Sequence, residues 1–355
     1  MKLLELHILQ SFPVSCLNRD DMGTPKTAMF GGVKRARISS QCLKRSQRML
    51  FKELLPDFCK GERTKLLVSA FHNLIASRPD CDSIPAELPA ILASAWCNTD
   101  SDKKSKDGMP KATTLTYLSP AEMTAMVDAA LQILSSSPNA KEKNITSAAL
   151  KAVKGAMAKD AADIALYGRM VASEASLTTE GAAMFSHALS THKSEPELDF
   201  YSAIDDLQPE DESGAGMTGI LEFSSACYYR YVAVNIDLLK SHLEGGAQEH
   251  VNEILEAFVR SVLLAVPSAR KNSMNAATVP SYVMGIVRDG HPIQFVNAFE
   301  SPVKTSKGYT EASINALKAE FEKMQNIWGL KVDAQAELPD TDLQSFVSVL
   351  MSALT

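Results

Sequence analysis

Seven lysine and arginine residues lie within positions 26–48, and this stretch contains no aspartate or glutamate. Single-stranded nucleic acid is bound by such cations, which follow the phosphates, together with hydroxyl and backbone N–H donors. The pair Gly31–Gly32 permits backbone conformations and close approaches that other residues resist. Ser39–Gln41 supply neutral donors at the start of a predicted helix, whose N-terminus favours anions. We therefore favour a nucleic-acid-binding surface over the alternative, a solvated basic helix face.

A second stretch without acidic residues covers 257–288. Within it, residues 267–280 are polar and predict a loop between a helix and a strand. Arg270 and Lys271 lie in this loop and are further candidates for phosphate contacts. An ordinary surface loop stays an equally open interpretation.

Motifs for catalysis or metal binding are weak. His187 and His192 are five residues apart, a spacing that does not place them on one helical face, so we predict no metal site from them. The paired carboxylates Asp20–Asp21 and Asp205–Asp206 are possible ligands of a divalent ion, although such pairs in loops more often form turns and caps. The chain contains no phosphate-binding, dinucleotide-binding or nucleophile-elbow motif. We therefore predict no catalytic residue and no cofactor.

The composition is that of a globular protein with 355 residues, enough for two domains, and a formal net charge of −6. Net acidity does not exclude nucleic acid, because a groove needs only local positive potential. No apolar run approaches the roughly 18 residues of a membrane span, and Glu5 and His7 interrupt the N-terminal one, which predicts a cytoplasmic protein without a membrane partner. Six scattered cysteines with no C-x-x-C pair argue against disulfides and zinc sites.

Two elements must position the first basic stretch. Alternation over residues 3–10 predicts a strand that ends at Pro13. A helix then begins at Ser39 or Ser40 and ends before Pro56. Its periodicity predicts an apolar face and, roughly opposite, a basic face: Leu43, Leu50 and Leu54, against Lys44, Arg48 and Lys52.

The rest of the chain predicts an insertion within an α+β domain. Residues 191–218 hold eight acids and show no period, which indicates a long loop with an aromatic pair, Phe200–Tyr201. Strands over 220–236 and 281–287, with a helix over 247–265 between them, complete a ferredoxin-like order of elements. Residues 97–114 predict a polar, mobile loop, and the Ala-rich segments of 57–190 predict helices over 62–77, 86–96, 119–135, 145–174 and 180–190.

The segment "SCLNRDDMGTPKTAMFGGVKRARISSQCLKRSQR" (15–48) resembles the backbone subunit of Cascade, the type I-E CRISPR effector complex (the CasC family of the RAMP superfamily). The match is long and specific, and further resemblances follow in order along the chain. They are "DIALYGRMVAS" (163–173), "SHALSTH" (186–192), "AIDDLQ" (203–208), "EFSSACYYRY" (222–231) and "NAFE" (297–300).

The resemblance implies a shape like a right hand. An RRM-like palm would comprise 1–56 and, with a C-terminal helical region, 219–355. A helical fingers insertion would span 57–190, and a thumb loop would span 191–218. Several copies would stack head-to-tail along one CRISPR guide RNA, kink it at intervals and present it for pairing with target DNA, alongside other Cascade subunits.

The resemblance also implies residue roles. Met170 would pack against bases near the kink, and Phe200 and Tyr201 would be the thumb aromatics, where the family more usually has Trp-Phe. Lys34, Arg35 and Arg37 have no role implied, and we look to them for contacts with the target strand or a neighbouring copy. The guide-phosphate contacts would fall on Arg19, Lys26, Ser39, Gln41, Lys44 and Arg48.

Two other functions stay open. The first is a metal-dependent endoribonuclease, as in related backbone subunits of type III complexes, with Asp20 or Asp21 as the catalytic residue. The second is a protein-only filament, in which the basic surface binds the acidic 191–218 segment of a neighbouring copy. The length and specificity of the first motif favour a non-catalytic RNA-binding scaffold.

Overall fold

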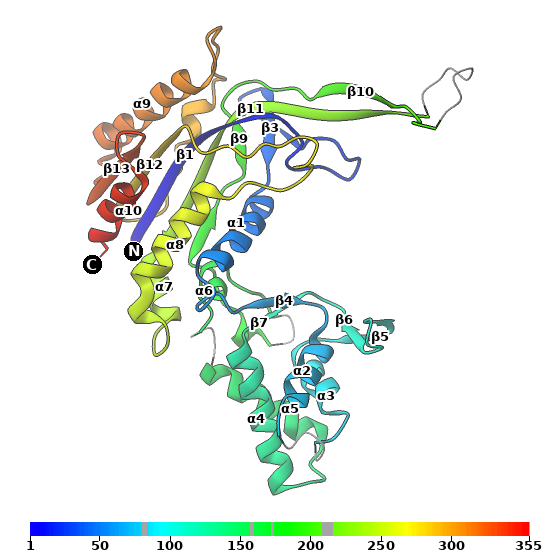
Figure 1. Ribbon diagram of the computed structural model, residues 1–355. Helices are drawn as coiled ribbons and strands as arrows, with labels where there is room; N and C mark the ends of the chain where they lie inside the picture. The colour runs from blue at the N-terminus through cyan, green and yellow to red at the C-terminus, as the bar shows by residue number, and fades with distance from the viewer. Residues whose placement is uncertain (80–83, 157–159, 172–173, 208–215, 355) are drawn as a thin grey trace. The chain divides into compact units, whose positions relative to one another are not determined.

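The computed structural model describes residues 1–79, 84–156, 160–171, 174–207 and 216–354, which fold into two compact units (Figure 1). The N-terminal basic stretch, the acidic segment and the C-terminal part belong almost entirely to the first unit. The domain boundaries drawn from the sequence stay predictions. The first unit contains Met1–Phe51, Met184–Ile236 and Leu255–Thr355, and the second contains Lys52–Ala183 and Asp237–Ile254.

A nine-stranded sheet forms the first unit. Its centre is β1 (Lys2–Ser15), which pairs antiparallel with β11 (Met217–Asn235) and with β12 (Tyr282–Asp289). The strand order is β13-β12-β1-β11-β9-β3-β2, and β8 and β10 also pair with β11. The predicted α+β class is confirmed. The remaining strands are β2 (Thr27–Phe30), β3 (Val33–Ile38), β8 (Ala183–Phe185), β9 (Ala188–Ser190), β10 (Glu197–Ala203) and β13 (Ala334–Leu338).

Helices cover both faces of this sheet. On one face, α1 (Ser40–Leu54) packs with β3 and β11, and α10 (Leu343–Ser352) packs with β12 and β13. On the other face, α9 (Thr310–Trp328) and the short helix η4 (Val296–Phe299) enclose an aromatic core. The helix α8 (Val251–Leu264) packs on the α1 side, where the Val262 carbonyl accepts a hydrogen bond from Arg230 of β11. None of the described helices has the length and apolar character that a membrane crossing requires.

The predicted helix after the basic stretch is confirmed, but its predicted apolar face is partly wrong. The buried side chains of α1 are Leu43, Gln47 and Phe51, whereas Leu54 is exposed. Phe51 packs edge-on against Phe258 of α8, and Gln47 donates a hydrogen bond to the Ser261 hydroxyl. A glutamine is tolerated inside because this bond satisfies part of its amide.

The segment 191–218, predicted to be a loop, contains a strand. Residues 197–203 form β10, which pairs residue by residue with the first part of β11, so that Phe200 lies opposite Ile220. The two strands form a ribbon that extends beyond the other strands of the sheet (Figure 1). Every residue of β10 is exposed except the half-buried Tyr201, so neither face of the strand is buried. Residues 208–215, in the middle of the predicted thumb, lie outside the described residues.

The second unit is mainly helical, with a core of its own. Two short two-stranded antiparallel sheets, β4–β7 and β5–β6, accompany the helices, and the β5–β6 hairpin replaces the loop predicted at 97–114. The helix predicted over 180–190 is wrong, because this segment forms β8 and β9 of the large sheet, and pairing with β3 and β11 overrides its Ala-rich propensity. Its elements before the sheet strands β8 and β9 are β4 (Glu62–Thr64), α2 (Leu67–Ala76), α3 (Leu88–Trp96), β5 (Thr99–Lys104), β6 (Pro110–Ala112), β7 (Thr116–Leu118), α4 (Pro120–Ser136), α5 (Glu142–Ala156), α6 (Ala162–Tyr167) and η2 (Ala175–Leu177). Two further elements follow β11 in the chain: α7 (Ile236–His242) and η3 (Gln248–His250).

Candidate nucleic-acid interface

A hydrogen-bonded turn carries the first two predicted contacts, Arg19 and Lys26. The Asp20 carboxylate accepts hydrogen bonds from the Met22 and Thr24 N–H groups at 2.9 and 3.0 Å and from the Thr24 hydroxyl at 2.8 Å. The hydroxyl bond, followed by the backbone bonds, lowers the pKa of Asp20. The Lys26 N–H closes the turn on the Asn18 carbonyl at 2.9 Å. Asp20 therefore organises the turn that presents the two cations.

The β2–β3 hairpin continues from this turn, and its tip is Gly31–Gly32. Both glycines have positive φ, +59° and +74°, which L side chains rarely adopt. A Cβ on Gly31 would lie 1.7 Å from the Glu300 carbonyl oxygen. The close approach predicted for these glycines is thus, at Gly31, an approach to the protein's own backbone.

The start of α1 carries the predicted neutral donors. The Ser39 hydroxyl accepts a hydrogen bond from the Cys42 N–H at 3.3 Å and so caps the helix, and Ser39 is only 7% exposed. Its N–H donates to the Asn18 amide oxygen at 2.8 Å, which joins the helix to the Asp20 turn. Gln41 is exposed in the first helical turn. The predicted donors therefore differ, since Ser39 is engaged in capping and Gln41 faces solvent.

Lys44 is half-buried, one turn into α1. Its ammonium nitrogen lies 5.0 Å from the centroid of the Phe185 ring, a cation–π contact, and burial lowers its pKa. Arg48 follows one turn later on the same helix face and is also half-buried. The ring under Lys44 restricts where its ammonium points, which a freely solvated lysine would not experience.

The loop between α8 and β12 carries Arg270 into the neighbourhood of Cys16, which Arg19 also approaches. Burial raises the pKa of the Cys16 thiol, the positive charges of Arg270 and Arg19 lower it, and the negative charges of Glu222 and Asp20 raise it. Ala276 of this loop belongs to the same buried cluster as Leu17, Ile38 and Leu43. The loop therefore packs on the same core as the Asp20 turn and α1, and Lys271 is exposed next to Arg270.

The complete burial of Arg35 contradicts one sequence-based prediction. The residue is 0% exposed, so the expected contact with a target strand or a neighbouring copy is wrong for this residue. Its guanidinium donates to the backbone carbonyls of Phe30, Ser190, Phe299 and Glu300 at 2.7–3.2 Å, and burial lowers its pKa. Arg35 is a structural residue that ties the β2–β3 hairpin to η4, whereas its neighbour Lys34 is exposed.

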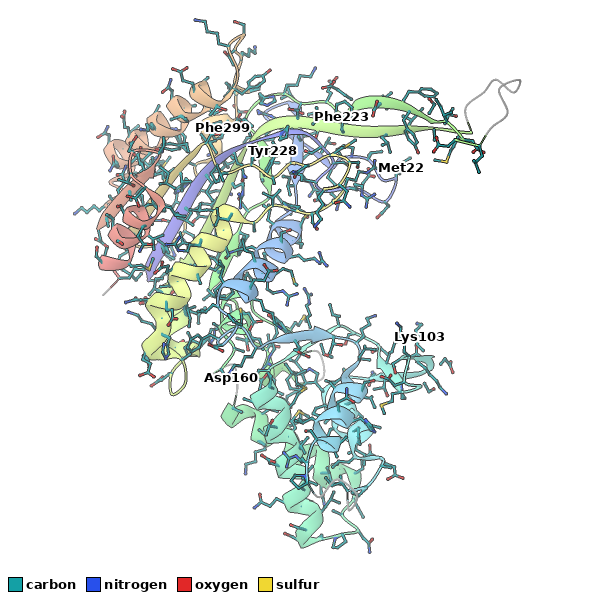
Figure 2. All side chains as sticks on the ribbon, viewed as in Figure 1. Met22, Lys103, Asp160, Phe223, Tyr228 and Phe299 are labelled. Carbon is teal, nitrogen blue, oxygen red and sulfur yellow. The ribbon has the colours of Figure 1, made fainter. Side chains whose placement is uncertain are left out.

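The predicted base-contacting residues are accessible. Met170, in the second unit, is 85% exposed, and the adjacent Arg169 is buried in an ion pair with Glu122 at 2.6 Å. On the β10–β11 ribbon, Phe200 is exposed, while the Tyr201 ring lies against Gly219, where a Cβ would come within 2.5 Å of it. Figure 2 shows side chains lining both edges of the ribbon.

Metal binding has little support in the described part of the chain. No group of three or more His, Cys, Asp or Glu side chains comes together there in a way that could hold an ion. The Asp20 carboxylate is already engaged in its own turn, while Asp21 is exposed. Phe185, Asn18 and His187, which accepts the Ser40 N–H at 2.9 Å, adjoin the basic surface and were not predicted as part of it.

Comparisons with known proteins agree with this architecture. A model of the family described as CT1975-like protein matches residues 4–348. A solved structure described as "CRISPR RNA-guided surveillance complex, pre-nicking" contains a chain 29% identical to this one, with a TM-score of 0.80 and a match covering 99% of this chain and 100% of that chain. A second, described as "CRISPR RNA-guided surveillance complex", is 23% identical with a TM-score of 0.62, covers 99% and 98% of the two chains, and shows the shared fold. None of the curated proteins matches this chain.

Proposed function

Because this chain belongs to the CT1975-like protein family, we propose that it is a Cascade backbone subunit that binds the guide RNA of a CRISPR RNA-guided surveillance complex. The observation that carries the proposal is the joined basic surface of Arg19, Lys26, Lys44 and Arg270. None of these four forms an ion pair within the described residues. Unpaired cations gathered from distant segments of an acidic chain are suited to a polyanion.

The finer assignments extend the proposal. The chain belongs to a type I-E complex in the cytoplasm, where copies of it assemble head-to-tail along one guide and contact other Cascade subunits. The nine-stranded unit is the RRM-like palm, the second unit provides the fingers, and the β10–β11 ribbon is the thumb. The resemblance of residues 15–48 to the backbone subunit supports these assignments, and the exposed Phe200 is consistent with a role for the ribbon in displacing a base.

The chemistry of the surface suits a guide of any sequence. Cations and the donors at the start of α1 bind phosphates, which carry no sequence information. Watson–Crick edges are left free, as they must be when base pairing supplies specificity for target DNA. Arg19, Lys26, Gln41, Lys44, Arg48, Arg270 and Lys271 are the phosphate contacts in this proposal, and Met170, Phe200 and Tyr201 are the base contacts.

Binding of unstructured RNA is therefore expected to depend on salt and not on sequence. With about four to six phosphates neutralised per subunit, the plot of log affinity against log salt should have a slope of roughly −3 to −4. Fluorescence anisotropy with several scrambled oligonucleotides, each titrated from low to high salt, measures both properties. A slope near zero, or a tenfold preference between scrambled sequences, would contradict phosphate binding.

We propose further that the chain is not an enzyme, against the endoribonuclease alternative. The Asp20 carboxylate accepts hydrogen bonds within the turn that presents Arg19, and this structural role accounts for the residue without catalysis. The same binding reactions, supplemented with Mg²⁺ and complementary RNA, should leave both strands intact. Discrete cuts that disappear with Asp21→Ala, while binding persists, would establish the endoribonuclease instead.

A further inference from the structure

Three polar residues occupy adjacent positions where β2, β3 and β9 lie side by side. The Arg37 N–H donates to the Lys26 carbonyl at 2.9 Å, and the register of β2 with β3 places these two residues opposite each other. Arg37 also pairs with Leu189 of β9. Extending that register by two residues places His187 opposite Ser39, on the same face as Arg37 and diagonal to it. Lys26, Arg37 and His187 are therefore neighbours on one face.

This arrangement is unfavourable without a ligand. Like charges directly opposite each other on paired strands destabilise a sheet. Arg37 Nε is also buried without a hydrogen-bond partner among the described residues. An unsatisfied buried donor costs about 1–3 kcal/mol. A hollow of about 10 Å³, large enough for a single water molecule, adjoins Lys26 and Arg37 but not His187. It is lined by Ser15, Leu17, Asn18, Pro25, Lys26, Arg37, Ile38, Ser224 and Tyr228.

The hydrogen bonding of His187 determines which of its nitrogens donates. Its Nδ1 accepts the Ser40 N–H at 2.9 Å, so in the neutral ring the proton resides on Nε2. His187 is exposed overall, and its slight burial, followed by the charges of Arg37 and Lys26, lowers the pKa of the ring, which favours its neutral form. His187 thus offers a neutral N–H donor of fixed orientation beside two cations.

We propose that Lys26, Arg37 and His187 together bind one phosphodiester of the guide RNA. The two cations supply the charge, and the His187 Nε2–H supplies a neutral hydrogen bond to a phosphate oxygen. This assignment rests on the proposed guide-binding function and adds two residues to its contacts. It also assigns Arg37 to the guide rather than to a target strand or a neighbouring copy.

Two substitutions of His187, each of which keeps one of its two hydrogen-bonding positions, separate phosphate binding from the bond to the Ser40 N–H at the start of α1. Asparagine places an acceptor near the position of Nδ1, so His187→Asn keeps the bond to the Ser40 N–H but lacks the outer donor. Glutamine places its amide near the position of Nε2, so His187→Gln keeps the donor and loses the acceptor for Ser40. We expect His187→Asn to weaken RNA binding about three- to tenfold, the effect of one hydrogen bond to a charged group, with unchanged thermal stability. We expect His187→Gln to bind within about twofold of wild type and to melt at a lower temperature.

Salt titrations distinguish the neutral donor from the cations. Because neutral His187 releases no counterion, the salt slope of His187→Asn should equal that of wild type, whereas Arg37→Gln should reduce its magnitude by about 0.7. The loss caused by His187→Asn should persist on an all-deoxy oligonucleotide, which keeps the phosphates. Wild-type affinity in His187→Asn, or a loss restricted to RNA, would overturn the phosphate site while the proposed function stands. Failure of the wild-type chain to bind RNA would overturn both.

Discussion

Replacing Arg19 and Lys44 together by glutamate is expected to abolish retention of the guide RNA while leaving the monomer folded. Arg19 lies next to Asp20 in its turn and Lys44 lies over Phe185, so the pair samples two separate elements of the basic surface. Bringing like charges together at an interface costs several kcal/mol, and two reversals should lower affinity at least about a hundredfold. The absorbance ratio of the purified protein at 260 and 280 nm reports the bound RNA, and circular dichroism reports the fold.

A matched control changes the net charge equally elsewhere in the same unit. Lys307 and Lys331 are both exposed, and neither belongs to the basic surface. Lys307→Glu with Lys331→Glu should retain wild-type RNA content. Because Lys44 is half-buried, Arg19→Glu with Lys44→Gln gives a second variant that keeps the side-chain stem against the Phe185 ring. RNA content equal to wild type in both Arg19→Glu with Lys44→Glu and Arg19→Glu with Lys44→Gln would refute the assignment of this surface.

Replacing Arg35 by methionine is expected to destabilise the first unit by about 3–5 kcal/mol. The substitution leaves four backbone carbonyls without their donor, and three of them, those of Ser190, Phe299 and Glu300, belong to segments distant in sequence. Each unsatisfied buried acceptor costs about 1–3 kcal/mol, reduced where water enters. For a unit of this size the melting temperature should fall by roughly 10 °C.

The neighbouring residue provides the comparison. Lys34 is exposed on the same strand, so Lys34→Met should change stability by no more than about 0.5 kcal/mol. Differential scanning fluorimetry of both variants measures the difference. An Arg35→Met protein that melts like wild type but no longer binds RNA would mean that Arg35 is a ligand contact and not the structural tie described here.

Alternation and capping residues predict two of the elements correctly. The strand over 3–10 was predictable because apolar residues recur at Leu4, Leu6 and Ile8, although both of its faces are buried and it continues past Pro13 to Ser15. The helix after Ser39 was predictable because a serine precedes it. The β10 strand was missed, because polar and apolar residues alternate only over Glu197–Phe200 and neither face of the strand is buried. The short strands β8 and β9 pair within the large sheet, a tertiary contact that a local Ala-rich pattern does not reveal.

The candidate site likewise contains residues that the sequence identifies and residues whose roles only the structure reveals. Charge and spacing identified the cations of the Asp20 turn and of α1. Arg35 and Arg37 are two residues apart on one strand and therefore share a face, so sequence treats them alike. Only the packing of Phe299 and Glu300 against the Arg35 guanidinium separates a structural arginine from an accessible one. The same reasoning applies to His187, whose role depends on the Ser40 N–H, which is distant in sequence.

The RNA that co-purifies with the protein distinguishes a guide-binding subunit from a protein-only filament. The chain should be purified, with its own partners present, from cells that transcribe a CRISPR array, and the bound nucleic acid should be sized and sequenced. We expect a discrete RNA of guide length that contains spacer sequence and is absent from Arg19→Glu with Lys44→Glu. A wild-type assembly free of RNA, with the absorbance ratio of protein alone, would rule out guide binding and support the protein-only filament.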